Sequence, residues 1–217
     1  DLPWLNVPAF VAATRDVPVQ ARIHDFLDTL AAGIAPAPMR AQGTDLAVLG
    51  YTSGTTGKPK GAMLSHRALA HSVVQRAMWH QDGTEHVELI ALPLSHLAAT
   101  QCMHLAVLAC SPIVLLARWD AGNTLALIER RRVTSVGMVT PMLIDFMAHP
   151  AQPGADLSSV RRLFCSATAT PEAVSNAVEK RLNLKYIESY GMTETCGGTH
   201  VNPPQAARRQ CAGLPHI

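Results

Sequence analysis

Residues 51–61 read Tyr51-Thr52-Ser53-Gly54-Thr55-Thr56-Gly57-Lys58-Pro59-Lys60-Gly61 and directly follow the apolar run 46–49. The stretch contains four small hydroxyl side chains, three glycines and two lysines. Glycines allow the backbone to curl so that successive N–H groups face an anion, while hydroxyl groups add donors and lysines add mobile positive charge. The composition of this loop therefore predicts a binding site for a polyphosphate.

Spacing distinguishes this loop from the Walker-type P-loop, which binds the same kind of ligand. That motif has four residues between its glycines and a Ser or Thr after the lysine. Here only Thr55 and Thr56 separate Gly54 from Gly57, and a proline follows Lys58. Proline lacks an N–H and has a fixed φ, so it cannot open a helix as the Walker geometry requires. The other alternative, a flexible polar linker, fits poorly because the glycines and lysines come in this order directly after an apolar run.

The overall composition describes a globular protein with few charges. Among 217 residues, 16% are charged, 48% are hydrophobic and 5% are aromatic. The core is therefore expected to consist mainly of aliphatic side chains and Met. The net charge is +2, and the arginine clusters are short and scattered rather than arranged in a stripe. Nucleic acid is not expected as a partner.

Cysteines, histidines and apolar runs bear on metals, compartment and membranes. The five cysteines are odd in number and form no CxxC pair, which is typical of reduced thiols in an intracellular protein. The ten histidines complete no ligand set with the spacing of a zinc site. The longest apolar stretch, 105–117, is broken by Ser111-Pro112 and is too short to span a bilayer, and the N-terminus lacks a signal core. We expect a cytoplasmic protein with no structural zinc and no integral membrane segment.

The chain is expected to consist of a peripheral region, 1–44, and an α/β core, 45–217. The first region contains a helical pattern around 23–30 that ends at Gly33, followed by the linker 35–38. In the core, apolar strand patterns alternate with longer helical patterns, which favours a mainly parallel β-sheet with helices on both faces. Strands are expected at 46–51, 87–92, 113–116, 134–139, 160–165 and 185–188, and helices at 65–79, 95–110, 121–132, 170–183 and from 140 onward.

The loops after these strands carry most of the candidate functional residues. In open α/β sheets, ligands bind beyond the carboxyl ends of the strands. Four segments occupy that position in the expected sheet, namely 52–61, 93–96, 166–168 and 190–194. We expect them to converge on one edge of the sheet and to form one site.

A second informative segment, 190–195, reads Tyr190-Gly191-Met192-Thr193-Glu194-Thr195. A strand is expected to end before it, and the glycine permits a sharp turn. The aromatic face can stack on a purine, the threonine can donate to a phosphate, and the carboxylate can hold Mg²⁺ against phosphate oxygens. Taken alone, the same residues fit a turn with a solvated glutamate equally well. Combined with the polyphosphate loop, they favour a nucleotide site.

The two segments together resemble the signatures of the adenylate-forming superfamily, which includes acyl-CoA synthetases, the adenylation domains of peptide synthetases and luciferases. Segment 52–66 is similar to the phosphate-loop signature of that family, and 190–194 is similar to its adenine and magnesium signature. Weaker similarity extends from Asp45 almost to the end of the chain, through 92–96 and 118–120.

This resemblance implies an AMP-forming acid–thiol ligase with the α/β fold described above. In such a reaction a carboxylic acid, here expected to be a fatty or similar acid, attacks the α-phosphate of ATP. The products are an acyl-adenylate and pyrophosphate, and coenzyme A then accepts the acyl group. The metal ion and the hydrogen-bond donors offset the charge that develops during the displacement. The implied small molecules are therefore the acid, ATP with Mg²⁺, and coenzyme A.

The resemblance also implies roles for individual residues. Lys60, Thr193 and Glu194 would act in catalysis, Glu194 would bind Mg²⁺, and Tyr190 would lie against the adenine. His96 would lie near the acyl carboxylate, although a histidine that caps a helix fits this position equally well. The residues expected to bind ATP or AMP are Thr52, Ser53, Gly54, Thr55, Thr56, Gly57, Lys58, Lys60, Ser166, Ala167, Thr168, Tyr190, Gly191, Met192 and Thr193.

The chain also departs from the family pattern. Where relatives commonly carry Gly-Gly-Ala, it has Ser166-Ala167-Thr168, whose side chains would narrow the pocket, and 209–215 follows the Gly-Ser-x-Gly-x-Pro pattern only loosely. The chain is expected to be an internal portion of the large N-terminal domain, without the small C-terminal domain that carries the adenylation lysine. Such a portion is not expected to be active alone. Two alternatives remain, a ligase that loads amino or aryl acids onto a carrier protein and a nucleotide-binding module without chemistry of its own.

Overall fold

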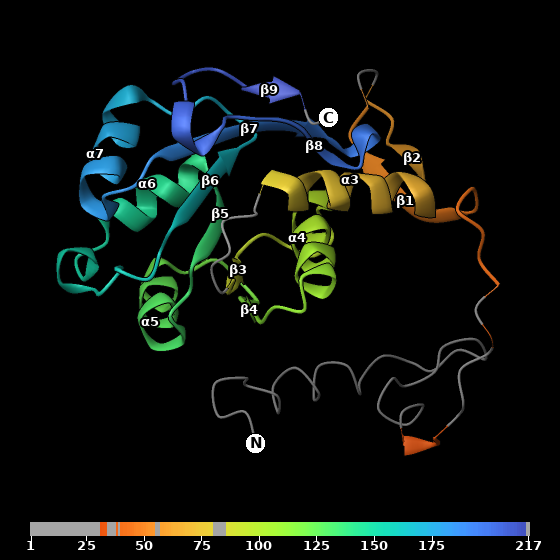
Figure 1. The fold of residues 1–217 in the computed structure, drawn as a ribbon, viewed down its shortest axis with the longest axis horizontal. Helices are drawn as coiled ribbons and strands as arrows, with labels where there is room; N and C mark the ends of the chain where they lie inside the picture. Colours follow the sequence, from red (N-terminus) through yellow and green to blue (C-terminus); the bar gives the residue numbers. More distant parts are fainter. Residues whose placement is uncertain (1–30, 34–37, 39, 55–56, 80–85, 216–217) are drawn as a thin grey trace. The chain divides into compact units, whose positions relative to one another are not determined.

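The computed structural model describes residues 31–33, 38, 40–54, 57–79 and 86–215. The chain divides into two units, 1–41 and 42–217, of which the first lies almost wholly outside the described residues. The expected helix at 23–30 and most of the expected linker at 35–38 therefore lie outside them as well. The fold of the second unit is described below and drawn in Figure 1.

The described strands of this unit form a two-stranded sheet and a seven-stranded sheet. The larger sheet has the order β4-β3-β5-β6-β7-β8-β9, in which the pairs from β4 to β7 are parallel and the last two pairs are antiparallel. The strands are β1 (Leu46–Thr52), β2 (Lys60–Ser65), β3 (Glu88–Ile90), β4 (Ile113–Leu115), β5 (Ser135–Val139), β6 (Arg162–Ser166), β7 (Tyr186–Met192), β8 (Gly197–Val201) and β9 (Leu214–Pro215).

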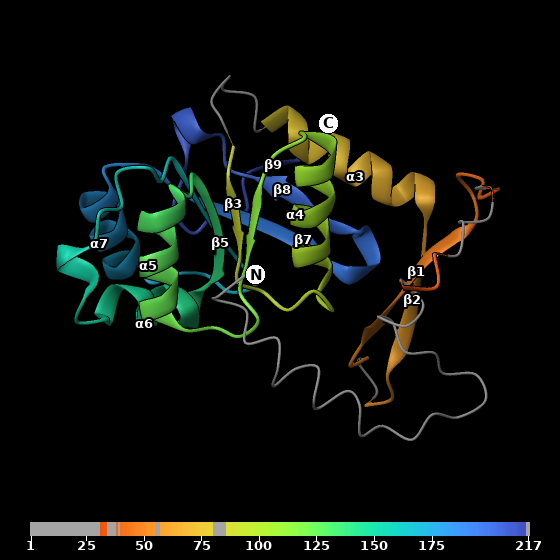
Figure 2. The same ribbon diagram turned by 90° about the horizontal axis from the view of Figure 1, so that it is seen from below.

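Helices cover both faces of the larger sheet, as the alternating pattern predicts. Figure 2 shows α5, α6 and α7 on one side of β3 and β5, and α3 and α4 on the other. The helices are α3 (His66–Trp79), α4 (Leu97–Leu108), α5 (Ala121–Arg131), α6 (Thr140–Ala148) and α7 (Glu172–Leu182), with short 3-10 turns η1 (Gln152–Gly154), η2 (Thr193–Thr195) and η3 (Pro204–Ala206).

The main core lies between the sheet and helices α5 to α7. Leu89, Val136 and Leu163 of three neighbouring strands belong to one hydrophobic cluster with Ile128 of α5 and Phe146 of α6, and all five are almost fully buried. Burying a side chain of this size contributes about 2 kcal/mol to the free energy of unfolding. The parallel α/β fold class is thus confirmed, with an aliphatic core. In the part of the chain that the structure describes, none of the helices has the length and apolar content needed to cross a bilayer.

The structure corrects the expected place of the strand at 46–51. It does not join the parallel sheet but pairs antiparallel with β2, so the polyphosphate loop is the tip of a hairpin. Gly54 and Gly57 in this loop have φ values of 67° and 81°, which reverse the chain and direct the next strand back along β1. The sequence suggests that this loop follows a strand of the parallel sheet. In the structure it instead connects the two antiparallel strands of the hairpin.

A second correction concerns the strand expected at 185–188. It extends to Met192, so Gly191 lies inside β7 rather than in a turn. A Cβ atom on Gly191 would lie 2.1 Å from the carbonyl oxygen of Gly197 on β8. The glycine is needed because two backbones approach closely at this point, and the turn itself is η2.

Candidate functional site

The hairpin loop has the backbone curvature that its glycines predict. A Cβ atom on Gly54 would lie 2.3 Å from the carbonyl oxygen of Lys58, so a larger residue cannot be placed there without moving the backbone. Lys58 and Lys60 are both exposed. The expected ligands Thr55 and Thr56 lie outside the described residues.

The turn that carries Glu194 lies directly against this hairpin. A Cβ atom on Gly50 of β1 would be 2.7 Å from Cγ2 of Thr193, so only glycine allows η2 to approach so closely. Thr193 is half-buried in this contact, whereas Glu194 is exposed. The contact joins two segments that lie far apart in the sequence.

The result is an open hollow of about 460 Å³ between the hairpin and η2. A lysine amine, two hydroxyl groups and one carboxylate converge on it, which is a set of groups that suits phosphate oxygens and a divalent cation together. The lining residues are Thr52, Ser53, Gly54, Lys60, Gly61, Ala62 and Glu194. Gly61 and Ala62 were missed by the sequence reasoning, because nothing in the sequence showed that the segment after Lys60 turns back as a strand.

Two other predicted nucleotide residues, Tyr190 and Met192 of β7, do not line the described part of this hollow. Tyr190 and Met192 are 49% and 45% exposed. The ring of Tyr190 meets the His200 ring edge-on, with centroids 6.1 Å apart and an interplanar angle of 65°. Because this contact uses the edge of one ring, stacking on the face of Tyr190 stays compatible with it.

The segment 166–168 leaves the sheet beside Tyr190. Strands β6 and β7 are parallel and pair up to Cys165 and Glu188; β6 ends at Ser166, whereas β7 continues to Met192 paired with β8. Ala167 is exposed and has a φ of 76°, a left-handed conformation that favours glycine. Of the four segments expected at one edge of the sheet, 166–168 and 190–194 thus belong to the neighbouring strands β6 and β7 and the residues after them, whereas 52–61 belongs to the separate two-stranded sheet.

Hydroxyl groups beneath this segment hold its position. Thr168 donates through Oγ1 to Oγ1 of Thr140 at 3.0 Å, and Thr140 in turn lies 3.0 Å from Oγ1 of Thr170. Thr170 also hydrogen-bonds to Tyr186, and burial raises the pKa of that phenol. Thr140 is the first residue of α6, and the N-cap is Val139. The hydroxyl group of Thr140 therefore bonds within this cluster and does not cap the helix.

His96 is the N-cap of α4. Its Nδ1 atom accepts a hydrogen bond from the backbone N–H of Ala98 at 3.2 Å, and the side chain is exposed. The capping interpretation is thus confirmed. A role toward the acyl carboxylate would have to use Nε2.

The residues at the hollow fit a magnesium ion bound together with a polyphosphate. Among the described residues, no group of three or more His, Cys, Asp or Glu side chains could hold a metal ion alone. Mg²⁺, however, is commonly bound through one or two carboxylates with water and substrate phosphates. Glu194 offers one carboxylate in a hollow that Lys60, Thr52 and Ser53 also line. This donor set suits Mg²⁺ that arrives with the nucleotide.

Comparisons with known proteins agree with this geometry. A family model described as AMP-binding enzyme matches residues 8–217. The chain is 37% identical over 161 residues to an indoleacetate–CoA ligase of Aromatoleum aromaticum, covering 73% of the chain and 31% of that protein. It is 32% identical over 161 residues to a long-chain-fatty-acid–CoA ligase of Bacillus subtilis, covering 73% and 29%.

The fold is also similar to solved structures. An O-succinylbenzoate coenzyme A synthetase of Bacillus subtilis, in complex with ATP and magnesium ion, matches with a TM-score of 0.73 and 29% identity. That match covers 82% of this chain and 37% of the other. The chain thus spans about a third of the length of these relatives. Because the family model matches almost the whole chain, the protein belongs to the AMP-binding enzyme family.

Proposed function

We propose that the chain forms the nucleotide-binding part of an AMP-forming acid–CoA ligase. The observation that carries this proposal is the hollow that Lys60, Thr52 and Ser53 of the hairpin line together with Glu194 of η2. Cationic, hydroxyl and carboxylate groups at one hollow suit a Mg²⁺-bound triphosphate better than a free anion, because a carboxylate alone would repel phosphate.

In the proposed reaction, a carboxylate oxygen of the acid attacks the α-phosphorus of ATP. The bond between the α-phosphorus and the bridging oxygen breaks, and pyrophosphate leaves with the electron pair. The hairpin hydroxyls, the loop N–H groups and the two lysines, Lys58 and Lys60, bind the departing β- and γ-phosphates. Because these groups are fixed before the reaction, they stabilise the charge that develops on the leaving group.

The remaining residues would orient the nucleotide and the acid. Glu194 binds Mg²⁺, which when bound neutralises phosphate charge, and Thr193 donates to the α-phosphate. Tyr190 lies against the adenine, and the segment 166–168 borders the same pocket. His96 faces the acid carboxylate through Nε2. In the second half-reaction the coenzyme A thiolate attacks the acyl carbonyl carbon and AMP leaves.

We propose a fatty or aryl acid as the substrate. A fatty acid is the expectation from the sequence, and one relative is named a long-chain-fatty-acid–CoA ligase. The chain is more similar in sequence to the indoleacetate–CoA ligase than to the fatty-acid ligase, which makes an aryl acid the other candidate. Both relatives are named CoA ligases, which supports coenzyme A over a carrier protein as acceptor.

The test uses the protein expressed from the complete reading frame that encodes these residues, called the complete protein below. With ATP, Mg²⁺ and a panel of fatty, aryl and amino acids, it should exchange labelled pyrophosphate into ATP with at least one fatty or aryl acid. Transfer to coenzyme A is then followed by thioester formation. No exchange with any acid would refute the enzyme proposal, and exchange with amino acids alone would assign the protein to the carrier-loading class.

Variants at the hollow give the first residue-level prediction. Lys60→Ala and Glu194→Ala should each lower the exchange rate by about 10²- to 10³-fold, because each removes a charged group that acts on the leaving pyrophosphate. Glu194→Ala should also raise the Mg²⁺ concentration needed for half-maximal exchange. Lys180→Ala, at an exposed lysine of α7, is the matched control and should leave the rate unchanged. An unaltered Mg²⁺ requirement in Glu194→Ala would contradict the metal-binding role.

A further inference from the structure

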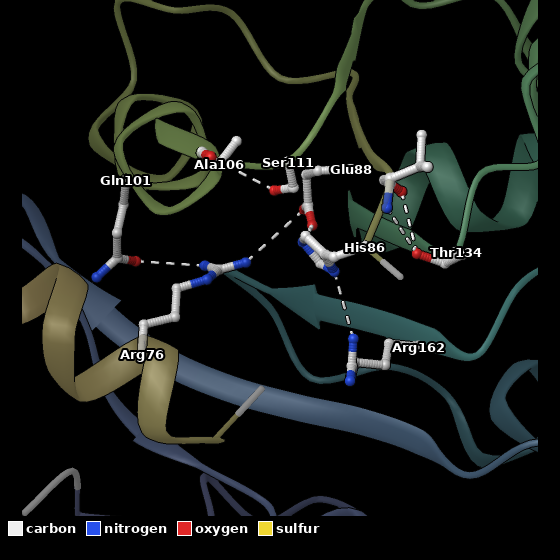
Figure 3. A network of polar contacts seen from close by, with 9 residues as sticks. Arg76, His86, Glu88, Gln101, Ala106, Ser111, Thr134 and Arg162 are labelled. Atoms are coloured by element: carbon white, nitrogen blue, oxygen red, sulfur yellow. Dashed lines mark hydrogen bonds and ion pairs between the residues drawn. The ribbon is translucent and has the colours of Figure 1, made fainter. Parts of the chain in front are cut away.

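A buried carboxylate on β3 begins a polar network that leads toward η2. Alternation along β3 places Leu89 in the core with α5 to α7, and Glu88 and Ile90 on the face that α3 and α4 cover. The Glu88 side chain is 0% exposed. Figure 3 shows Glu88 beside Arg76 and His86. One carboxylate oxygen lies 3.9 Å from Nη2 of Arg76, and the other lies 3.0 Å from Nε2 of His86.

The Arg76 guanidinium links this carboxylate to α4. It lies over the ring of Phe164 on β6, 5.5 Å from the ring centroid, and its Nη1 donates to Oε1 of Gln101 at 3.3 Å. A planar guanidinium held by an ion pair, an aromatic face and an amide has little freedom to turn. Burial raises the pKa of the neighbouring Cys102 thiol to about 12, against the opposing effect of Arg76, so that thiol stays neutral beside the pair.

The orientation of the Gln101 amide follows from this contact. A guanidinium has donors and no acceptor, so the amide oxygen must face Arg76 and the amide nitrogen must point the other way. That nitrogen donates to Oγ of Ser72 on α3, and Ser72 donates in turn to the carbonyl oxygen of Cys196 at 3.0 Å. The hydrogen bonds from Arg76 to Cys196 therefore all run in one direction.

The network ends at the backbone that closes η2. Cys196 is the residue directly after η2 and has a φ of 61°, and Gly197 follows with a φ of 111°. A Cβ atom on Gly197 would lie 2.9 Å from Oε1 of Gln101, so the amide also packs on the glycine. The turn that carries Glu194 is thus held by a hydrogen bond through Ser72 and by direct packing on Gln101.

We infer that Ser72 and Gln101 are positioning residues for Glu194, and that the buried Glu88–Arg76 pair orients Gln101 for this role. The inference rests on the proposed function of Glu194. The hydrogen bonds of Thr195 to Met192 and Gly197, and of the Cys196 N–H to Thr193, are local to the turn. Ser72 and Gln101 tie the turn to α3 and α4, and a displacement of about 1 Å in a catalytic group costs about 100-fold in rate. A buried side-chain network that fixes such a turn therefore has a functional consequence.

The first measurement concerns the turn itself, in the complete protein and without ligand. Ser72→Ala removes the donor to Cys196, and Gln101→Met removes the amide at similar length. Hydrogen–deuterium exchange of the segment 190–198 should become about tenfold faster in both, with exchange of 135–139 in the central sheet unchanged. If the exchange rate of 190–198 is the same in both variants as in the unsubstituted protein, the inference is overturned, whatever the affinity for Mg·ATP.

The second measurement is the affinity for Mg·ATP by calorimetry. Ser72→Ala should raise the dissociation constant for Mg·ATP about five- to tenfold, and that for AMP without Mg²⁺ less than about twofold. In a Glu194→Ala background, Ser72→Ala should raise the dissociation constant for Mg·ATP by less than a further factor of about two, because the effect of Ser72 passes through Glu194. Equal losses in both backgrounds would show a general structural effect and would overturn the positioning role.

Ser175→Ala is the matched control. Ser175 is also a buried helical serine, on α7, and its Oγ donates to the carbonyl oxygen of Glu172 at 3.0 Å, away from η2. It should change neither the exchange of 190–198 nor the affinity for Mg·ATP. If the unsubstituted protein does not bind Mg·ATP, the proposed function fails and the inference fails with it. If it binds and only the Ser72 and Gln101 effects are absent, the inference alone is wrong.

Discussion

Ala167 adopts a backbone conformation that an alanine rarely takes. Its φ of 76° lies in the left-handed region, where a Cβ atom costs about 1–2 kcal/mol. The residue is exposed. The next residue, Thr168, fixes the segment by a hydrogen bond from its hydroxyl group to Thr140. The strained alanine thus lies at the edge of the pocket proposed for the nucleotide.

Ala167→Gly should therefore stabilise the protein by about 0.5–1 kcal/mol, since relief of the strain exceeds the entropy that glycine adds to the unfolded chain. Urea unfolding gives the free energy. Ala169→Gly is the control in the same turn, because Ala169 is also exposed and has no positive φ. The control should lose about 0.5–1 kcal/mol. A loss of stability in both variants would contradict the strain at residue 167.

At the scale of elements, β7 and β8 depend on the close approach of two glycines. Gly191→Ala would place a Cβ atom 2.1 Å from the backbone oxygen of Gly197, and a backbone cannot yield as a flexible side chain does. We expect a loss of about 2 kcal/mol or more in the free energy of unfolding, measured by urea titration. Pyrophosphate exchange should fall as well, because η2 directly follows β7.

Gly154→Ala is the matched control for this variant. Gly154 has open space around the position of a Cβ atom and no positive φ. Its replacement should change the free energy of unfolding by less than about 0.5 kcal/mol. If Gly191→Ala is as stable as this control, β7 and β8 can move apart without a loss in the free energy of unfolding, and the expected effect of the close approach is wrong.

The same elements show how far the sequence predicts the structure. Short apolar segments alternating with helix signals identified the parallel strands β3 to β7, because these elements are decided by local patterning and burial. The pairing of β1 was predicted wrongly, because an apolar strand before a glycine-rich loop fits a hairpin and a parallel sheet equally well. Gly191 was predicted as a turn residue, since local sequence does not show that a second backbone comes within van der Waals distance.

The site was predictable in its residue types but not in its contacts. Lys60 and Glu194 were identified from their motifs, and the structure brings them to one hollow. Ser72 and Gln101 carry no sequence signal, because a serine and a glutamine in helices are ordinary residues until the tertiary fold joins them. Networks of this kind depend on contacts between residues far apart in the chain.

At the scale of the whole molecule, the hollow is open and the chain spans about a third of the length of its relatives. The described residues supply groups for the phosphates and the metal ion, but an adenylation reaction also needs the acid held in line with the α-phosphate and water excluded. We therefore expect these 217 residues alone to form acyl-adenylate at least about 100-fold more slowly than the complete protein.

Single-turnover formation of acyl-adenylate from labelled ATP measures this difference, with the best acid from the exchange panel. Circular dichroism of the isolated chain serves as the control, because a slow rate is informative only if the chain is folded. Equal rates for the isolated chain and the complete protein would show that the hairpin, η2 and the segment 166–168 suffice for adenylation, and that the open hollow closes without other parts of the polypeptide.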